Sequence, residues 1–169
     1  APALVGQGRR DRTVVVNAAR PDLTPGEEGD DEEEGGLFHL YEVDVDTAEW
    51  TRLSFAEPPA WLLHHPGTRR LIGAGRIGEE GQRYHFIDED AAARWASIQR
   101  AFPGQSPQRV SWSRDLRQIV VYLDGPGQSG VYHFVDFERR RADIIGESYP
   151  TIQGEAVAPV RPVSYAAGD

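Results

Sequence analysis

The chain has 169 residues, of which 39% are hydrophobic, with 18 glycines, 12 prolines, no cysteine and a net charge of −9. This length allows one domain with a core, and the glycine and proline content suits a turn-rich β fold better than a helical one. The composition excludes disulfides and thiolate chemistry, argues against nucleic-acid binding, which needs a basic surface, and includes no apolar run long enough to cross a bilayer.

The first third of the chain predicts strands separated by a long polar segment. Residues 13–17 form a β-branched run typical of a strand. Residues 18–36 carry prolines, glycines and the acidic run 27–34, from which no core can be built, so we predict a loop. Residues 37–46 resume as a strand and pair through a tight turn with residues 49–55.

The middle third predicts a further set of antiparallel strands. Residues 60–65 form an apolar strand that ends at the turn dipeptide Pro66-Gly67. Residues 71–77 then pair with residues 82–88 across a glycine-containing turn.

Residues 90–102 predict the one helix, packed as an insertion between β units. Asp88 or Asp90 can cap its start, and Pro103-Gly104 ends it. Three apolar residues share one helical face: Trp95, Ile98 and Phe102.

The last third returns to a strand pattern. We predict strands at residues 109–112, 117–123, 131–137 and 142–145, the second pairing with the third. From residue 149 onward three prolines predict an extended connection.

A short motif recurs along the chain. Tyr84-His85-Phe86-Ile87-Asp88 returns as Tyr132-His133-Phe134-Val135-Asp136, with a looser copy at Leu40-Tyr41-Glu42-Val43-Asp44. The three aspartates are 44 and then 48 residues apart, about the length of a four-stranded propeller blade. The motif falls on the third strand of each unit, with the aspartate at the turn before the fourth.

The predicted fold class is therefore all-β, with about three four-stranded antiparallel propeller blades and one short helix near residues 90–102. This partial β-propeller spans residues 1–148. Its blade units lie around residues 1–56, 57–90 and 105–148. The acidic run 27–34 is an inserted hairpin loop.

The repeated residues indicate architecture rather than chemistry. Alternation places Tyr84, Phe86 and Asp88 on one face of a strand, where the aromatic rings suit a core and the carboxylate can accept N–H bonds in a turn. His85 and His133 lie in different units, whereas a metal site needs a convergent cluster, so we interpret both as half-buried strand histidines.

No other pattern gives a site. His64 and His65 are adjacent, so in a regular strand they cannot bind the same ion. The acidic run 27–34 lacks the spacing and closing Glu of a calcium loop, which favours a solvated loop. We predict no catalytic, cofactor-binding or metal-binding residue, and no cofactor.

Nucleophilic catalysis finds no motif in this chain. There is no G-x-S-x-G elbow, and residues 127–130 indicate a turn. The chain also has neither Cys nor Lys. We therefore expect this chain alone not to be an enzyme.

The C-terminal third resembles the last propeller blade of prolyl oligopeptidase-family serine peptidases, the bacterial acylaminoacyl-peptidase-like branch most of all. The resemblance covers about residues 95–169 and is only a blade pattern before that. It rests on these segments: Phe102-Pro103-Gly104, Val110-Ser111-Trp112-Ser113-Arg114-Asp115, and Gly130-Val131-Tyr132-His133-Phe134-Val135-Asp136. In residues 156–169, Tyr165, Ala167 and Asp169 match the Tyr-x-Ala-x-Asp-Gly pattern that opens the family's α/β-hydrolase domain.

The resemblance implies a propeller that covers a peptidase active site and restricts entry to short peptides. Residues 149–169 would then be a linker toward an α/β-hydrolase domain, the expected partner, which holds the catalytic serine, aspartate and histidine of the family. The substrate-amine-binding glutamates of the dipeptidyl branch have no match, since Glu79-Glu80 lies in a plain turn. The chain has no Met, and we expect it to be a piece of a longer protein.

Two other hypotheses remain open. One is a stand-alone β-repeat interaction module that binds through the acidic loop or an exposed blade edge. The other is a small independent hydrolase, which predicts turnover of activated esters by the 169-residue chain; we expect none. The sequence identifies neither the compartment nor the peptide specificity.

Overall fold

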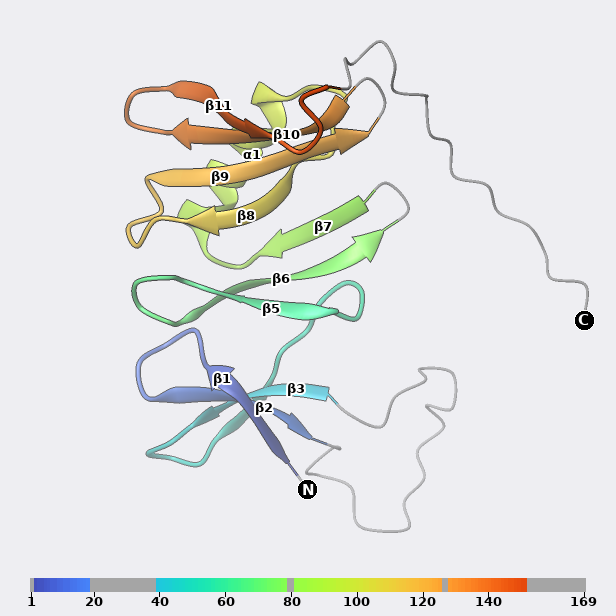
Figure 1. Cartoon of the computed structure of the whole chain (residues 1–169). Coiled ribbons are helices and arrows are strands. Elements are labelled where there is room, and N and C mark those ends of the chain that lie inside the picture. The colour runs from blue at the N-terminus through green and yellow to red at the C-terminus, as the bar shows by residue number, and fades with distance from the viewer. Residues whose placement is uncertain (1, 19–38, 79–80, 126–127, 152–169) are drawn as a thin grey trace, which may run out of the picture. The chain divides into compact units, whose positions relative to one another are not determined.

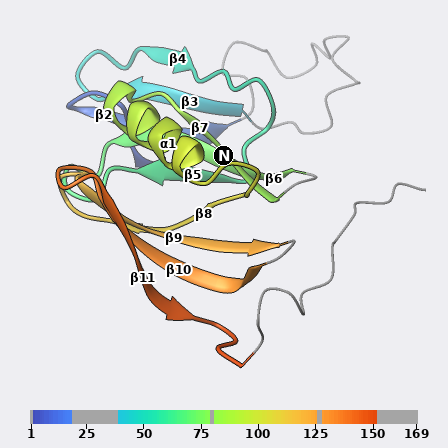
Figure 2. The ribbon, with the colours of Figure 1, turned by 90° about the horizontal axis from the view of Figure 1, so that it is seen from above.

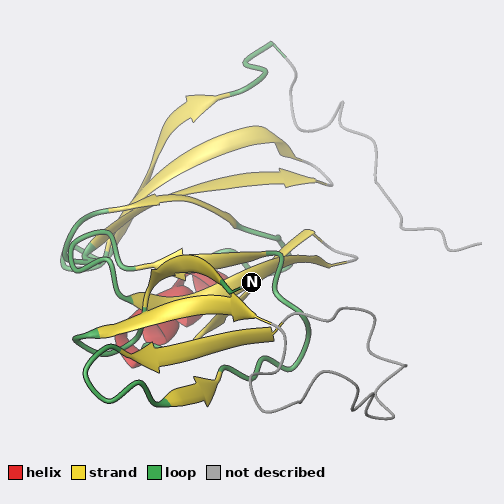
Figure 3. Ribbon diagram, turned by 90° about the horizontal axis from the view of Figure 1, so that it is seen from below, coloured by secondary structure: helices red, strands yellow, loops and turns green. Residues whose placement is uncertain are grey.

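A computed structural model describes residues 2–18, 39–78, 81–125 and 128–151 (Figure 1). The chain divides into two compact units, the first formed by residues 1–58 and 69–71 and the second by residues 59–68 and 72–169. Strands dominate both units (Figure 3). No helix among the described residues has the length and apolar character needed to cross a membrane.

The first unit is built on one antiparallel sheet of four strands that follow one another in order, β1-β2-β3-β4. The strands are β1 (Ala3–Gln7), β2 (Thr13–Ala18), β3 (His39–Asp44) and β4 (Trp50–Arg52). Pairing of β2 with β3 runs from Thr13 opposite Asp44 to Ala18 opposite His39. This register confirms that β2 and β3 form a hairpin whose connection contains the acidic run 27–34. Residues 19–38 themselves lie outside the described part of the chain.

The second unit contains two antiparallel sheets, again with sequential strand order. The first holds β5 (Trp61–His64), β6 (Leu71–Gly78) and β7 (Gly81–Phe86). The second holds β8 (Gln108–Trp112), β9 (Gln118–Gly125), β10 (Gln128–Asp136) and β11 (Arg141–Glu147). The all-β prediction with propeller-like blades is confirmed, but the middle sheet has three strands among the described residues instead of four.

Helix α1 (Glu89–Ala101) follows β7, at the point where the repeat predicts a fourth strand, and packs alongside β7 (Figure 2). Asp88 is its N-cap: the Ala91 backbone N–H donates to Asp88 Oδ1 at 2.8 Å. Trp95, 6% exposed, and Ile98, 1% exposed, lie on the buried face as predicted. The buried face of α1 therefore packs beside β7 in the place where a fourth strand was predicted.

The core of the second unit joins α1 to both sheets. Trp95 and Ile98 pack with three buried β9 and β10 residues, namely Ile119, Val121 and Val135. Rings of the middle sheet complete this core: Tyr84 lies edge-on to Trp95 at 4.7 Å between ring centroids, and Phe86 stacks on Trp112 at 5.5 Å. The aromatic face of β7 is thus covered by α1 and by the start of the next sheet.

In the last copy of the motif, the two faces of strand β10 have different surroundings. His133 pairs with Val121 and Val135 pairs with Ile119, so these residues share the core face. Tyr132 and Phe134 lie on the opposite face, where both are only half-buried. The prediction that the repeated aromatics form the core is confirmed for Tyr84 and Phe86 and is wrong for Tyr132 and Phe134.

Removal of the N-cap tests the start of α1. We expect Asp88→Ala to destabilise the second unit by about 1 kcal/mol, because the Ala91 N–H loses its acceptor. Asp90→Ala is the matched control, since Asp90 lies in the first turn and Asp88 makes the capping bond. Urea unfolding checks both variants, and a larger loss for Asp90→Ala would contradict the assignment.

Candidate functional site

The repeated aspartates hold turns. Asp44 Oδ1 accepts the backbone N–H groups of Asp46 at 2.9 Å and Thr47 at 3.1 Å. Asp136 Oδ1 accepts those of Glu138 at 3.0 Å and Arg139 at 2.9 Å. These bonds confirm that the last motif residue is a turn former in the first and third copies, whereas Asp88 caps helix α1 instead.

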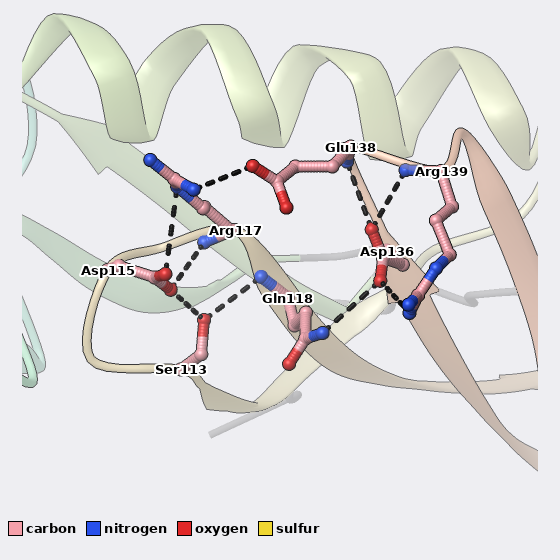
Figure 4. A network of polar contacts seen from close by, with 7 residues as sticks. All are labelled: Ser113, Asp115, Arg117, Gln118, Asp136, Glu138 and Arg139. Carbon is pink, nitrogen blue, oxygen red and sulfur yellow. Dashed lines mark hydrogen bonds and ion pairs between the residues drawn. The ribbon is translucent and has the colours of Figure 1, made fainter.

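A polar network links the β8–β9 turn to the β10–β11 turn at one end of the last sheet (Figure 4). Gln118 Nε2 donates to Asp136 Oδ2 at 3.2 Å, and the Gln118 backbone N–H donates to Ser113 Oγ at 2.9 Å. The Ser113 hydroxyl in turn donates to Asp115 Oδ1 at 2.7 Å. Arg117 closes the network by donating to Glu138 Oε1 at 2.6 Å, so the β8–β9 and β10–β11 turns are fixed to each other.

The carboxylates of these turns are held in their charged form. The Arg139 backbone N–H, against a smaller opposing effect of burial, lowers the pKa of Asp136, and the Ser113 hydroxyl lowers the pKa of Asp115. The backbone N–H of Thr47 does the same for the pKa of Asp44. Each lowered pKa stabilises the folded chain above about pH 4, and this contribution is lost as the pH falls through the folded-state values.

The histidines named by the sequence do not converge. His85 is exposed, whereas His133 is half-buried with its ring 4.9 Å from that of Phe102, and burial lowers the pKa of His133. Across the residues that the structure describes, no three His, Asp or Glu side chains are grouped so that they could hold a metal ion.

The adjacent histidines have separate surroundings. His65 Nδ1 lies 3.0 Å from the Gly67 backbone nitrogen and 3.1 Å from that of Thr68, and accepts both N–H bonds. His65 thus stabilises the turn at Pro66-Gly67 in the way an aspartate would. His64 instead lines a small cavity beside Trp112.

A groove of about 530 Å³ lies between α1 and the β10–β11 turn. We call it the arginine groove. Its floor is apolar and includes Ile98, Val135 and Phe137. Its cationic side chains are Arg94, Arg140 and Arg141, and Asp90 and Asp136 also line it.

Arg94 and Arg140 carry the cationic character of this groove. The guanidinium of Arg94 lies 5.5 Å from the centre of the Phe137 ring, and Arg94 Nε is buried with no hydrogen-bond acceptor among the described residues. Arg141 is already engaged by Asp143 at 2.6 Å, and Asp136 by its own turn.

The side chains of the arginine groove are suited to binding a ligand. Its one hydroxyl nucleophile candidate, Ser97, donates to the Ala93 carbonyl at 3.0 Å and accepts a bond from Arg100, and no histidine lines the groove. Such an arrangement can hold an extended, partly apolar and anionic segment.

Sequence reasoning did not find this groove. The available signal was the run Arg139-Arg140-Arg141 shortly after the last motif, which predicts a cationic turn but not the helix opposite it. Glu79-Glu80 and the acidic run 27–34 lie outside the described residues. Residues 128–130, predicted as a turn, belong to β10, so the β9–β10 connection is tighter than expected.

The fold and these contacts define a class: an all-β chain of successive blade-like antiparallel sheets whose repeated carboxylates hold turns. Comparison with protein-family models gave no matching family, and a search of curated proteins gave no match.

Proposed function

We propose that this chain is the non-catalytic β-propeller portion of a prolyl oligopeptidase-type serine peptidase, where it covers the active site and restricts access to short peptides. One observation carries the proposal: three successive antiparallel sheets each have their strands in sequential order, and the motif aspartate lies at or just after the end of the third strand of each. Such repetition at blade length is typical of propellers.

The different packing of the aromatic residues in the last two copies of the motif also supports a longer propeller. Tyr84 and Phe86 are covered by the segment that follows them, α1 and β8. Tyr132 and Phe134 occupy the equivalent positions of the last sheet and belong to neither described core cluster. In the proposed parent protein this second aromatic face packs against a further blade, because each blade of a propeller is covered by its neighbours.

The experiment is serine labelling of the longer protein. The reading frame that contains this chain is expressed in full and treated with a fluorophosphonate, which reacts with an activated serine. The proposal predicts labelling at a serine beyond residue 169 and cleavage of short peptides but not of folded proteins. The 169-residue chain alone, used as the control, is expected to stay unlabelled. A reading frame that closes shortly after Asp169 contradicts the proposal.

The second candidate is a β-repeat interaction module. The arginine groove favours it, because the groove combines an apolar floor with two cations that have no carboxylate partner among the described residues. It predicts that the 169-residue chain binds an acidic peptide and that Arg94→Gln with Arg140→Gln abolishes binding. Exposed Arg100→Gln is the matched control on the same helix. Binding unchanged by the double substitution would rule out the groove.

A further inference from the structure

A small cavity lies in the second unit where β5, β7 and β8 meet. It has a volume of about 40 Å³ and is lined by residues of these three strands, of β6 and of the turn after β5. Most of its wall is apolar: Leu63, Pro66, Ile72 and Phe86. The polar lining comes from His64, Arg109 and Trp112, with no carboxylate among the lining residues.

Two N–H donors of this lining lack an acceptor. Arg109 Nε and Trp112 Nε1 are both buried and have no hydrogen-bond partner among the described residues. Arg109 also takes part in no ion pair with a described carboxylate. Buried donors are normally satisfied by protein, water or an ion, since leaving them unsatisfied is costly.

Both donors are held in place by their neighbours. The Trp112 indole stacks on Phe86 with 5.5 Å between ring centroids and an interplanar angle of 29°. The Arg109 backbone N–H donates to Tyr84 Oη at 2.9 Å, which fixes β8 against β7 at this point. Contacts with neighbouring core residues therefore fix the positions of both N–H groups.

The size and charge of the cavity select its ligand. A volume above about 10–15 Å³ is enough for a water-sized ligand, so this cavity admits a water molecule or a monatomic ion but not a peptide carboxylate. The guanidinium charge and the two N–H donors favour an anion over a cation.

We propose that this cavity is a binding site for a monovalent inorganic anion, held by Arg109 Nε–H and Trp112 Nε1–H. The anion neutralises a partly buried guanidinium and fills the space between β8 and the middle sheet. This inference is independent of the proposed peptidase role, because it rests only on contacts within the second unit.

The test uses the indole N–H signals of the chain, which has four tryptophans. Chloride replaces gluconate, an anion too large for the cavity, at constant ionic strength in a ¹⁵N–¹H titration. We expect one indole signal to shift with a saturating dependence on chloride, and Trp112→Phe to remove that signal. Shifts that are linear in chloride and alike in all four indoles would overturn the proposal and indicate a site for water only.

A pair of arginine variants makes the test specific. Arg109→Met is expected to abolish the saturating shift of the Trp112 signal. Arg114→Met, an exposed arginine of the following turn that does not line the cavity, is expected to retain it. A saturating shift that persists in a folded Arg109→Met variant would contradict the site. If that variant does not fold, the wild-type titration decides alone.

Discussion

Trp95→Ala is expected to destabilise the second unit by about 4 kcal/mol, the largest effect of any single substitution considered for this chain. Trp95 is 6% exposed and, with Ile98, packs α1 against the strands of this core. Its ring lies 4.7 Å from that of Tyr84 and 6.0 Å from that of Phe86. Alanine leaves a cavity at the centre of this cluster, because the flanking β-strands cannot close onto the helix without losing their register.

Urea unfolding combined with hydrogen exchange checks this prediction. Exchange should rise in β7, β9 and β10 while the first unit stays protected. Trp50→Ala is the matched control: Trp50 is 37% exposed at the edge of the first sheet and contacts Tyr41 edge-on. We expect that control to cost about 1 kcal/mol. Equal losses for the two variants would show that Trp95 is not central to the core.

Glu42→Ala is expected to destabilise the first unit by about 3 kcal/mol, because it removes a buried carboxylate that accepts charge-assisted hydrogen bonds from Arg9 and a hydrogen bond from Thr13. The Glu42 side chain is fully buried. Its Oε2 accepts from Arg9 Nη2 at 2.7 Å, and its Oε1 accepts from the Arg9 backbone N–H at 2.5 Å and from Thr13 Oγ1 at 2.9 Å. The carboxylate therefore ties the β1–β2 turn to the third strand.

The contacts around Glu42 also explain why residue 8 is a glycine. A Cβ on Gly8 would lie 2.2 Å from Thr13 Oγ1 and 2.6 Å from Glu42 Oε1, so only glycine lets the turn approach the carboxylate.

The pH dependence of the first unit follows from the same contacts. Burial raises the pKa of Glu42, but the hydrogen bonds from Arg9 and Thr13 outweigh it and leave the pKa below its ordinary value. A lowered folded-state pKa stabilises the unit above the unfolded value of about 4.3 and stops doing so as the pH falls through the folded value.

Glu42→Gln isolates this charge. We expect it to cost about 2 kcal/mol at pH 7 and to differ little from the wild type at strongly acid pH. Denaturant unfolding across that pH range measures the difference. A cost that does not depend on pH would mean that the charge of Glu42 contributes nothing.

The sequence was sufficient for features that depend on local chemistry. The recurrent motif marks the third strand of each sheet, and the turn role of Asp44 and Asp136 follows from a carboxylate at a strand end. The helix is also local in origin, since its apolar face and its cap are both present in the sequence. Strand β1 was missed because Ala3–Gln7 is mostly exposed and has no clear alternation.

The remaining features depend on contacts between distant segments. Whether Tyr132 faces the core is decided by what lies beside the sheet, not by the strand itself. The arginine groove and the small cavity each need a helix or strand from elsewhere in the chain to close them.

The central claim is that the motif belongs to a repeating stack that continues past the last described sheet, and a pair of equivalent substitutions tests it most directly. In the 169-residue chain we expect Phe86→Ala to cost about 3 kcal/mol and Phe134→Ala below about 1 kcal/mol, because Phe86 packs against the core of the second unit and Phe134 belongs to neither of its core clusters. In the full-length protein the two costs should become similar, as a further blade covers Phe134. If Phe134→Ala remains harmless in the full-length protein, the stack does not continue and the account is contradicted.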